Sequence, residues 1–205
     1  MTVFLSNYVS NKTNPQFFVY LEGFRNHLAL IQQDKSLFLL KKALFFLRTL
    51  QKQKQSILFI NNNPDLSFLI QKTAVNLNQP YSNESWIPGL LTNWRAFKPS
   101  VQSFDLCVKY FGQFLEKKQM NLPKYLKQKK KLQGLTVLKD KPSALVLFQY
   151  QGNESILKEA KMCNIPVVIF MDCPGSSLDV EYLIPLNTQS LPLIYFFCSL
   201  LCQRK

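Results

Sequence analysis

Five lysines crowd into eight residues of this sequence, at positions 124–131. They are Lys124, Lys127, Lys129, Lys130 and Lys131, with no acidic residue between them. Ammonium groups this close repel one another in water, whereas each one that neutralises a phosphate on a nucleic acid releases condensed counterions. The spacing therefore predicts a segment that binds phosphates, not one that performs catalysis.

The charge of the whole chain supports this prediction. The 205 residues include 25 Lys+Arg and 12 Asp+Glu, which gives a net charge of +13. Residues 1–141 hold 21 basic and 7 acidic residues, whereas residues 142–205 hold 4 and 5. A surplus this large favours a polyanionic partner, nucleic acid ahead of an anionic membrane. Its distribution predicts a basic part of the molecule supported by a nearly neutral part.

Both tryptophans of the chain lie within residues 79–97, beside basic residues. Trp86 is expected to anchor this stretch against a sheet edge. For Trp94 we prefer a place in the core, with stacking on a nucleotide base as the alternative. Arg95 and Lys98 are polar neighbours of the apolar anchors, and we expect them to contact RNA.

Three further residues of this stretch are expected to shape its backbone. Thr92 and Asn93 suit the start of a helix, because their side chains accept hydrogen bonds from free backbone N–H groups. Gly89 lies in a Pro-Gly break. We therefore assign Trp86, Gly89, Thr92 and Asn93 to a structural motif.

A helix is predicted over residues 34–53, with Asp34 as its N-cap. Its apolar face would carry Leu39, Ala43, Phe46 and Leu50. Lys41, Arg48 and Lys52 recur at spacings of seven and four, which places them on another face. That face is either merely solvated or a ridge that follows RNA phosphates, and we include all three among the RNA-binding candidates.

The rest of the chain alternates between short apolar runs and helical segments. The runs cover residues 56–60, 144–150, 165–171 and 181–185, and helices are expected to begin after Asn63, Asn153 and Asn187. Continuously apolar strands between helices indicate a mainly parallel sheet covered on both faces. The predicted fold is a three-layer α/β/α, doubly wound, flavodoxin-like domain. It spans residues 1–205 and carries a short basic helical insertion at 100–135.

Such a fold often belongs to nucleotide enzymes, but the sequence lacks their phosphate-binding loops. NNNPD follows the first apolar run and QYQGNES the second, and neither is a glycine-rich cradle. Asp172 and Asp179 follow a strand, where loop and capping roles are the commoner ones. The five cysteines form no C-x-x-C pair and there is one histidine, so we expect no metal, cofactor or small-molecule substrate.

The order of these blocks resembles one family, ribosomal protein S2 of the small ribosomal subunit. The resemblance rests on Trp86-Ile87-Pro88-Gly89-Leu90-Leu91-Thr92-Asn93-Trp94-Arg95, on Arg25-Asn26, and on Asn153, Glu159, Asn164-Ile165-Pro166 and Ile184-Pro185. Arg25 lies within the family pattern and is included among the rRNA-binding candidates. The sequence departs from the pattern at Pro88 and His27, which stand where the family usually has glycine, and at Gln149, which replaces an acid.

The resemblance implies a non-catalytic constituent of the small ribosomal subunit that binds rRNA and neighbouring ribosomal proteins. The shortened insertion and a composition rich in Phe, Lys and Asn resemble a mitochondrial form encoded in the organelle and working in the matrix. No secretory signal is recognised, and the longest apolar run, residues 191–202, is too short to cross a bilayer. The alternatives are a doubly wound enzyme with an unrecognised site and a free nucleic-acid-binding module.

Overall fold

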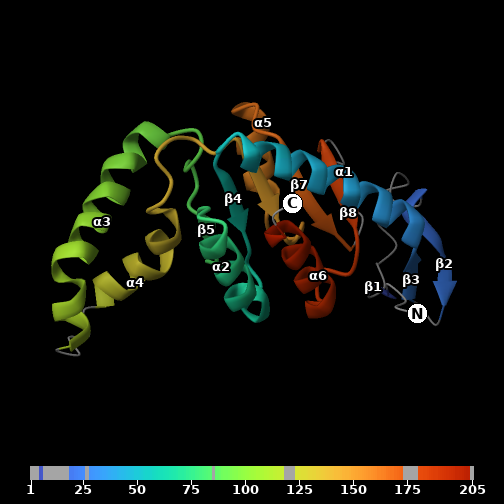
Figure 1. The fold of residues 1–205 in the computed structure, drawn as a ribbon, viewed down its shortest axis with the longest axis horizontal. Coiled ribbons are helices and arrows are strands. Elements are labelled where there is room, and N and C mark those ends of the chain that lie inside the picture. Colours follow the sequence, from blue (N-terminus) through green and yellow to red (C-terminus); the bar gives the residue numbers. More distant parts are fainter. Residues whose placement is uncertain are drawn as a thin grey trace.

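A computed structural model gives the fold of the chain (Figure 1). It describes residues 5–6, 19–25, 28–84, 86–117, 123–172 and 180–203. Predictions for Asn26, His27 and Asp179 concern positions outside these ranges.

The centre of the molecule is a five-stranded parallel sheet. Its strands are β4 (Ile57–Ile60), β5 (Tyr81–Ser82), β6 (Ala144–Leu147), β7 (Val167–Met171) and β8 (Tyr182–Pro185). They lie side by side in the order β5-β4-β6-β7-β8, and every pair is parallel. Numbered along the chain, this is the order 2-1-3-4-5 of flavodoxin-like folds. The predicted fold class and the four predicted apolar strands are confirmed.

Helices cover both faces of this sheet. They are α1 (Gln33–Lys52), α2 (Ser67–Asn76), α3 (Trp94–Lys117), α4 (Pro123–Leu132), α5 (Glu154–Met162) and α6 (Leu191–Cys202). Two short 3-10 turns, η2 (Pro64–Leu66) and η3 (Gln133–Leu135), precede α2 and follow α4. The helices α1, α2 and α6 share one core cluster with the sheet, whereas α5, η3 and the start of α3 share another.

Aromatic rings fill the first cluster. Phe148 stacks on Phe170 with ring centroids 5.4 Å apart, and Phe197 of α6 meets Phe170 edge-on at 4.8 Å. All three rings are fully buried. The apolar run of α6, predicted as a buried terminal helix, therefore closes the core on this face.

A second, small antiparallel sheet was not predicted. It consists of β1 (Leu5–Ser6), β2 (Leu21–Arg25) and β3 (Leu28–Ile31) in the order β1-β3-β2. Figure 1 places this sheet at one end of the molecule and the α3–α4 hairpin at the other.

The basic insertion is a helical hairpin of α3 and α4, but its boundaries are not independent of the core. Trp94, Val101 and Phe104 of α3 are buried, as are Gly134 and Leu135 after α4. The predicted limits of 100–135 therefore separate residues that pack together.

Gly134 lies in η3 and does not have a positive φ. A Cβ at this position would lie 2.1 Å from the Tyr81 carbonyl oxygen, so glycine permits η3 to approach β5 closely.

Only one of the predicted N-caps keeps its expected role. Asn63 accepts a hydrogen bond from Asp65 N at 3.0 Å. The cap position of α1 is Gln32 instead of Asp34, and that of α6 is Ser190 instead of Asn187. Asn153 occupies the cap position of α5, but its side chain makes no capping bond there. The predicted cap position is therefore right for Asn153, whose side-chain oxygen accepts from Asn62 Nδ2 instead, and wrong for Asp34 and Asn187.

The buried face of α1 is also rotated from the predicted one. It carries Ser36, Leu40, Ala43, Leu44, Leu47 and Leu50. Leu39 and Phe46, which we predicted for this face, are only partly buried.

Candidate nucleic-acid interface

The loop that contains Trp86 is held by one buried carboxylate. Glu159 of α5 accepts three hydrogen bonds from this loop: from Trp86 Nε1 at 3.0 Å, Gly89 N at 2.8 Å and Leu91 N at 3.2 Å. Glu159 is 7% exposed, so each bond compensates for solvation that burial removes. Trp86 is an anchor, as predicted, but its polar partner is a helix and not the sheet edge.

Gly89 has the conformation that this motif requires. Its φ is +81°, a left-handed value that favours glycine. Its carbonyl accepts from Asn93 N at 2.8 Å, which closes the turn before α3. Asn93 in turn accepts at its backbone oxygen from Ala96 and Phe97. The helix therefore starts at the expected position, with Thr92 and Asn93 exposed beside it.

Trp94 belongs to the core. Its side chain is 5% exposed and packs in the second core cluster with Leu90 and Leu91. A buried ring presents no free face to a nucleotide base, so our alternative of stacking is withdrawn. Because its ring is buried, Trp94 is removed from the RNA-binding candidates.

The basic residues that follow Trp94 differ from each other. Arg95 is exposed in the first turn of α3. Lys98 Nζ lies 2.9 Å from Asp140 Oδ1, and these side chains are 39% and 85% exposed. An ion pair this accessible contributes little to stability, so Lys98 can exchange Asp140 for a phosphate at small cost.

The lysine cluster lies on α4, the second helix of the hairpin. Lys127 and Lys130 are exposed, whereas Lys129 and Lys131 are partly buried; the side chain of Lys124 lies outside the described residues. The opposite side of the helix faces α3, because Tyr125 contacts Phe104 with ring centroids 6.3 Å apart. The hairpin thus directs lysines outward and holds them on a packed support.

The predicted ridge on α1 is not uniform. Lys41 and Lys52 are exposed. Arg48 is partly buried, and its Nη2 donates to the Leu200 carbonyl of α6 at 2.7 Å. Arg48 therefore joins two helices, a role that the sequence spacing gave no reason to expect.

The candidates do not form one continuous site. Arg25 ends β2, and its side chain lies outside the described residues. Figure 1 shows β2 and α4 at opposite ends of the molecule, with α1 crossing between them. An RNA that contacts all these elements must follow the length of the protein.

The position where doubly wound proteins bind nucleotides is occupied by asparagine side chains. This position is the gap beyond β4 and β6, where the strand order reverses. Asn62 Nδ2 donates to Asn153 Oδ1 at 2.6 Å across the gap, and Asn61 Nδ2 donates to the Asn63 carbonyl at 2.7 Å. These hydrogen bonds use the asparagine side chains to join the loop after β4 to the loop after β6 and to fix its own backbone, so the asparagines have a structural role here.

Thr188 Oγ1 donates to Asp172 Oδ2 at 2.5 Å, which gives this acid a structural partner. Within the described ranges, no three His, Cys, Asp or Glu side chains are grouped so that they would hold a metal ion. In the same part of the chain, every helix is too short or too polar to span a membrane.

Sequence reasoning missed the role of Glu159, although a signal was present. Ile156, Glu159 and Ala160 recur at helical spacing and are all buried. A carboxylate on an otherwise apolar helix face must find donors inside the protein, and that pattern marks it as structural.

The five-stranded order and the outward lysine face together define a doubly wound α/β protein that carries a basic helical hairpin. The sequence profile of the family described as "Ribosomal protein S2" matches residues 3–204. The chain belongs to the ribosomal protein S2 family.

Three relatives illustrate its similarity to known proteins. The small ribosomal subunit protein uS2m of Marchantia polymorpha is 30% identical over 188 residues, covering 89% of this chain and 79% of the relative. The uS2 protein of Ehrlichia chaffeensis is 28% identical over 196 residues, covering 93% and 68%. That of Rubrobacter xylanophilus is 27% identical over 198 residues, covering 94% and 65%.

Proposed function

We propose that this chain is a structural constituent of a mitochondrial small ribosomal subunit, where it binds rRNA and neighbouring ribosomal proteins without catalysing a reaction. Membership of the ribosomal protein S2 family is the observation that carries this proposal. The similarity to the Marchantia uS2m supports the mitochondrial form. We further propose that the chain works in the matrix and is encoded in the organelle, because its composition resembles that of such genomes.

The exposed basic residues would provide the affinity for rRNA. Lys127, Lys130 and Arg95 on the hairpin, with Lys41 and Lys52 on α1, are exposed cations. Each contact with a phosphate releases counterions, so binding would be strong at low salt and would weaken as salt rises. Such contacts position the protein on folded RNA and need no sequence readout.

Apolar side chains on the helical face opposite α5 support contacts with proteins. The exposed ones on α1, α2 and α6 include Phe38, Phe45, Phe68, Val75, Tyr195 and Phe196. Large apolar groups that remain in contact with water are typical of surfaces that a partner covers. We therefore assign neighbouring ribosomal proteins to this face and rRNA to the basic elements.

Sedimentation tests the proposal against its alternatives. A tagged chain expressed in mitochondria of the source organism should co-sediment with small subunits and remain there at moderate salt. A free nucleic-acid-binding module would instead remain near the top of the gradient or follow bulk RNA. An enzyme would bind NAD or ATP saturably, and that binding would be lost on changing the Asn61–Asp65 loop.

A further inference from the structure

A small apolar hollow of about 30 Å³ lies between the first two turns of α1 and of α6. Its floor is formed by Leu40, Ile184 and Leu186, which are all buried. Its rim is accessible, because Leu37 of α1 is 42% exposed and Phe196 of α6 is 49% exposed. A molecule that approaches this face therefore contacts the rim, and the floor limits how deeply it can enter.

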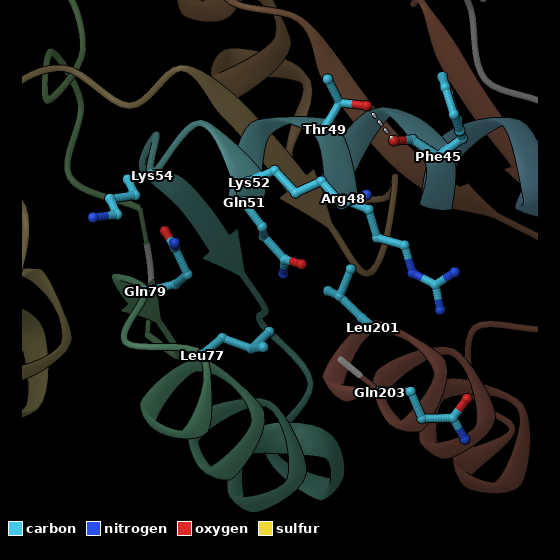
Figure 2. A pocket seen from close by; sticks show the side chains of 10 residues that line it. All are labelled: Phe45, Arg48, Thr49, Gln51, Lys52, Lys54, Leu77, Gln79, Leu201 and Gln203. Atoms are coloured by element: carbon cyan, nitrogen blue, oxygen red, sulfur yellow. Dashed lines mark hydrogen bonds between the residues drawn. The ribbon is translucent and has the colours of Figure 1, made fainter. Parts of the chain in front are cut away.

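The hollow lies at one end of the seam along which α1 and α6 lie side by side. At the other end, Arg48 Nη2 donates to the Leu200 carbonyl at 2.7 Å and joins the two helices. Figure 2 shows the Arg48 side chain reaching from α1 toward α6. Leu37 and Arg48 are eleven positions apart, which corresponds to about 16 Å along a helix axis. The seam is therefore as long as about three turns of a helix.

The lining of the hollow selects an aliphatic side chain. Of the described residues that line it, Ser36 alone is polar, and its hydroxyl donates to the Pro185 carbonyl at 2.6 Å. A nucleotide base or a phosphate placed here would lose water from its polar atoms without gaining a partner. An aliphatic group has only apolar surface to remove from water, and that removal favours binding.

The charge beside the hollow is positive. Lys41 is exposed and follows Leu37 by four positions, so both side chains lie on the same side of α1, one turn apart. The helices α1, α2 and α6 together carry six Lys or Arg residues, and Asp34 is their one acid. A partner with carboxylates complements this charge, whereas a basic partner would be repelled.

We propose that an amphipathic helix of a neighbouring ribosomal protein docks along the α1–α6 seam. One aliphatic side chain of that helix enters the hollow between Leu37 and Phe196, and a carboxylate about one turn away pairs with Lys41. Lys41 then leaves the set of phosphate contacts, and of the two exposed lysines on α1 only Lys52 remains for rRNA. The proposal rests on the proposed function, because it takes the partner from the small ribosomal subunit, and it names the chemistry of that partner.

Carbodiimide coupling in purified mitochondrial small subunits tests the ion pair that the proposal requires. The reagent joins a lysine amine directly to a carboxylate in contact with it, so Lys41 is coupled only where an acid lies against it. Mass spectrometry of the digested subunits identifies the joined peptides. We expect Lys41 to be joined to Asp or Glu of another protein, in a helical segment with an aliphatic residue about one turn from that acid.

The variant Phe196→Gln tests the hollow, because it removes an apolar wall and leaves Lys41 unchanged. Coupling of Lys41 should fall about tenfold, as expected when an interface loses one apolar anchor. Phe68→Gln is the matched control and should couple like the wild type, because Phe68 is exposed on α2 and does not line the hollow. Coupling is divided by the amount of each variant in the subunits. If Phe196→Gln fails to assemble, Leu37→Gln on the opposite wall provides the same comparison.

Four outcomes would overturn the proposal although the chain is present in small subunits. Lys41 that is not coupled would show that no acid covers it, and coupling to an acid of this same chain would show that its own segment does. An RNA adduct on the Lys41 peptide after ultraviolet irradiation would assign the seam to rRNA. Equal losses in Phe196→Gln and Phe68→Gln would show that the hollow has no particular role. If the chain is absent from small subunits, the proposed function itself fails, and sedimentation shows this before any coupling.

Discussion

The indole nitrogen of Trp86 donates a hydrogen bond to Glu159 Oε1 at 3.0 Å, across 73 positions of sequence. The same oxygen accepts from Gly89 N at 2.8 Å, and the second oxygen accepts from Leu91 N. One carboxylate on α5 therefore fixes the path of the chain from β5 to the basic hairpin. The direction of the hairpin depends on this buried group.

Replacing Glu159 with alanine should destabilise the fold by about 3 kcal/mol, because three hydrogen-bond donors lose their acceptor. Two of these donors are backbone N–H groups, of Gly89 and Leu91. Glu159→Gln keeps one acceptor oxygen and should cost less. Urea denaturation measures both free energies of unfolding. Glu154→Ala, on the exposed face of the same helix, is the control and should change stability by less than about 1 kcal/mol. Equal effects of the two alanine variants would show that the three bonds are energetically unimportant.

Gly134→Ala should destabilise the protein by about 3 kcal/mol, because the new Cβ would overlap the Tyr81 carbonyl, a backbone group that cannot move aside cheaply. Gly23→Ala is the control, since no atom lies within 4 Å of its added Cβ. It should change the free energy of unfolding by about 0.5 kcal/mol or less. Thermal unfolding compares the two variants, and a normal midpoint for Gly134→Ala would mean that η3 and β5 are not in close contact.

The double variant Lys127→Gln/Lys130→Gln should weaken binding to duplex rRNA and reduce the log–log salt slope by about 1.8, or 0.9 for each lost phosphate contact. Its thermal midpoint should remain near that of the wild type, because both side chains are exposed. Lys72→Gln/Lys158→Gln, two exposed lysines on α2 and α5, is the charge-matched control. If the α4 variant unfolds earlier and keeps the wild-type slope, its lysines serve the fold and not the RNA.

Stability should fall as the pH rises from 9 to 11 through the thiol of Cys198. Burial raises the pKa of this thiol from 9.0 to about 11. In that interval the unfolded chain loses the proton while the folded chain retains it, so unfolding becomes more favourable. Cys198→Ala removes this contribution, and its midpoint should fall less steeply with pH than that of the wild type. If the midpoints of the wild type and of Cys198→Ala fall equally with pH, the thiol lies in a solvated environment.

The sequence by itself determined the parts of this protein whose physical cause is local. Short, continuously apolar runs between helical segments favour strands buried on both faces, and β4, β6, β7 and β8 lie where those runs predicted. Asn63 before Pro64 predicted the turn that opens α2, because an Asx side chain bonds its own near backbone. The lysine cluster predicted an outward basic face, since its members are too close to be buried together.

Only the tertiary structure decided the contacts between distant segments. Glu159 accepts hydrogen bonds from the Trp86 loop, and Arg48 donates one to α6. Gly134 packs closely against β5. For Trp94 the sequence favoured the core but left stacking on RNA open, and only its surroundings decided between them. Periodicity and capping report interactions within a few residues, whereas these partners are chosen by how the helices pack on the sheet. The partner of a buried polar group such as the Glu159 carboxylate is whatever donor lies across the interface, and no local pattern encodes that choice.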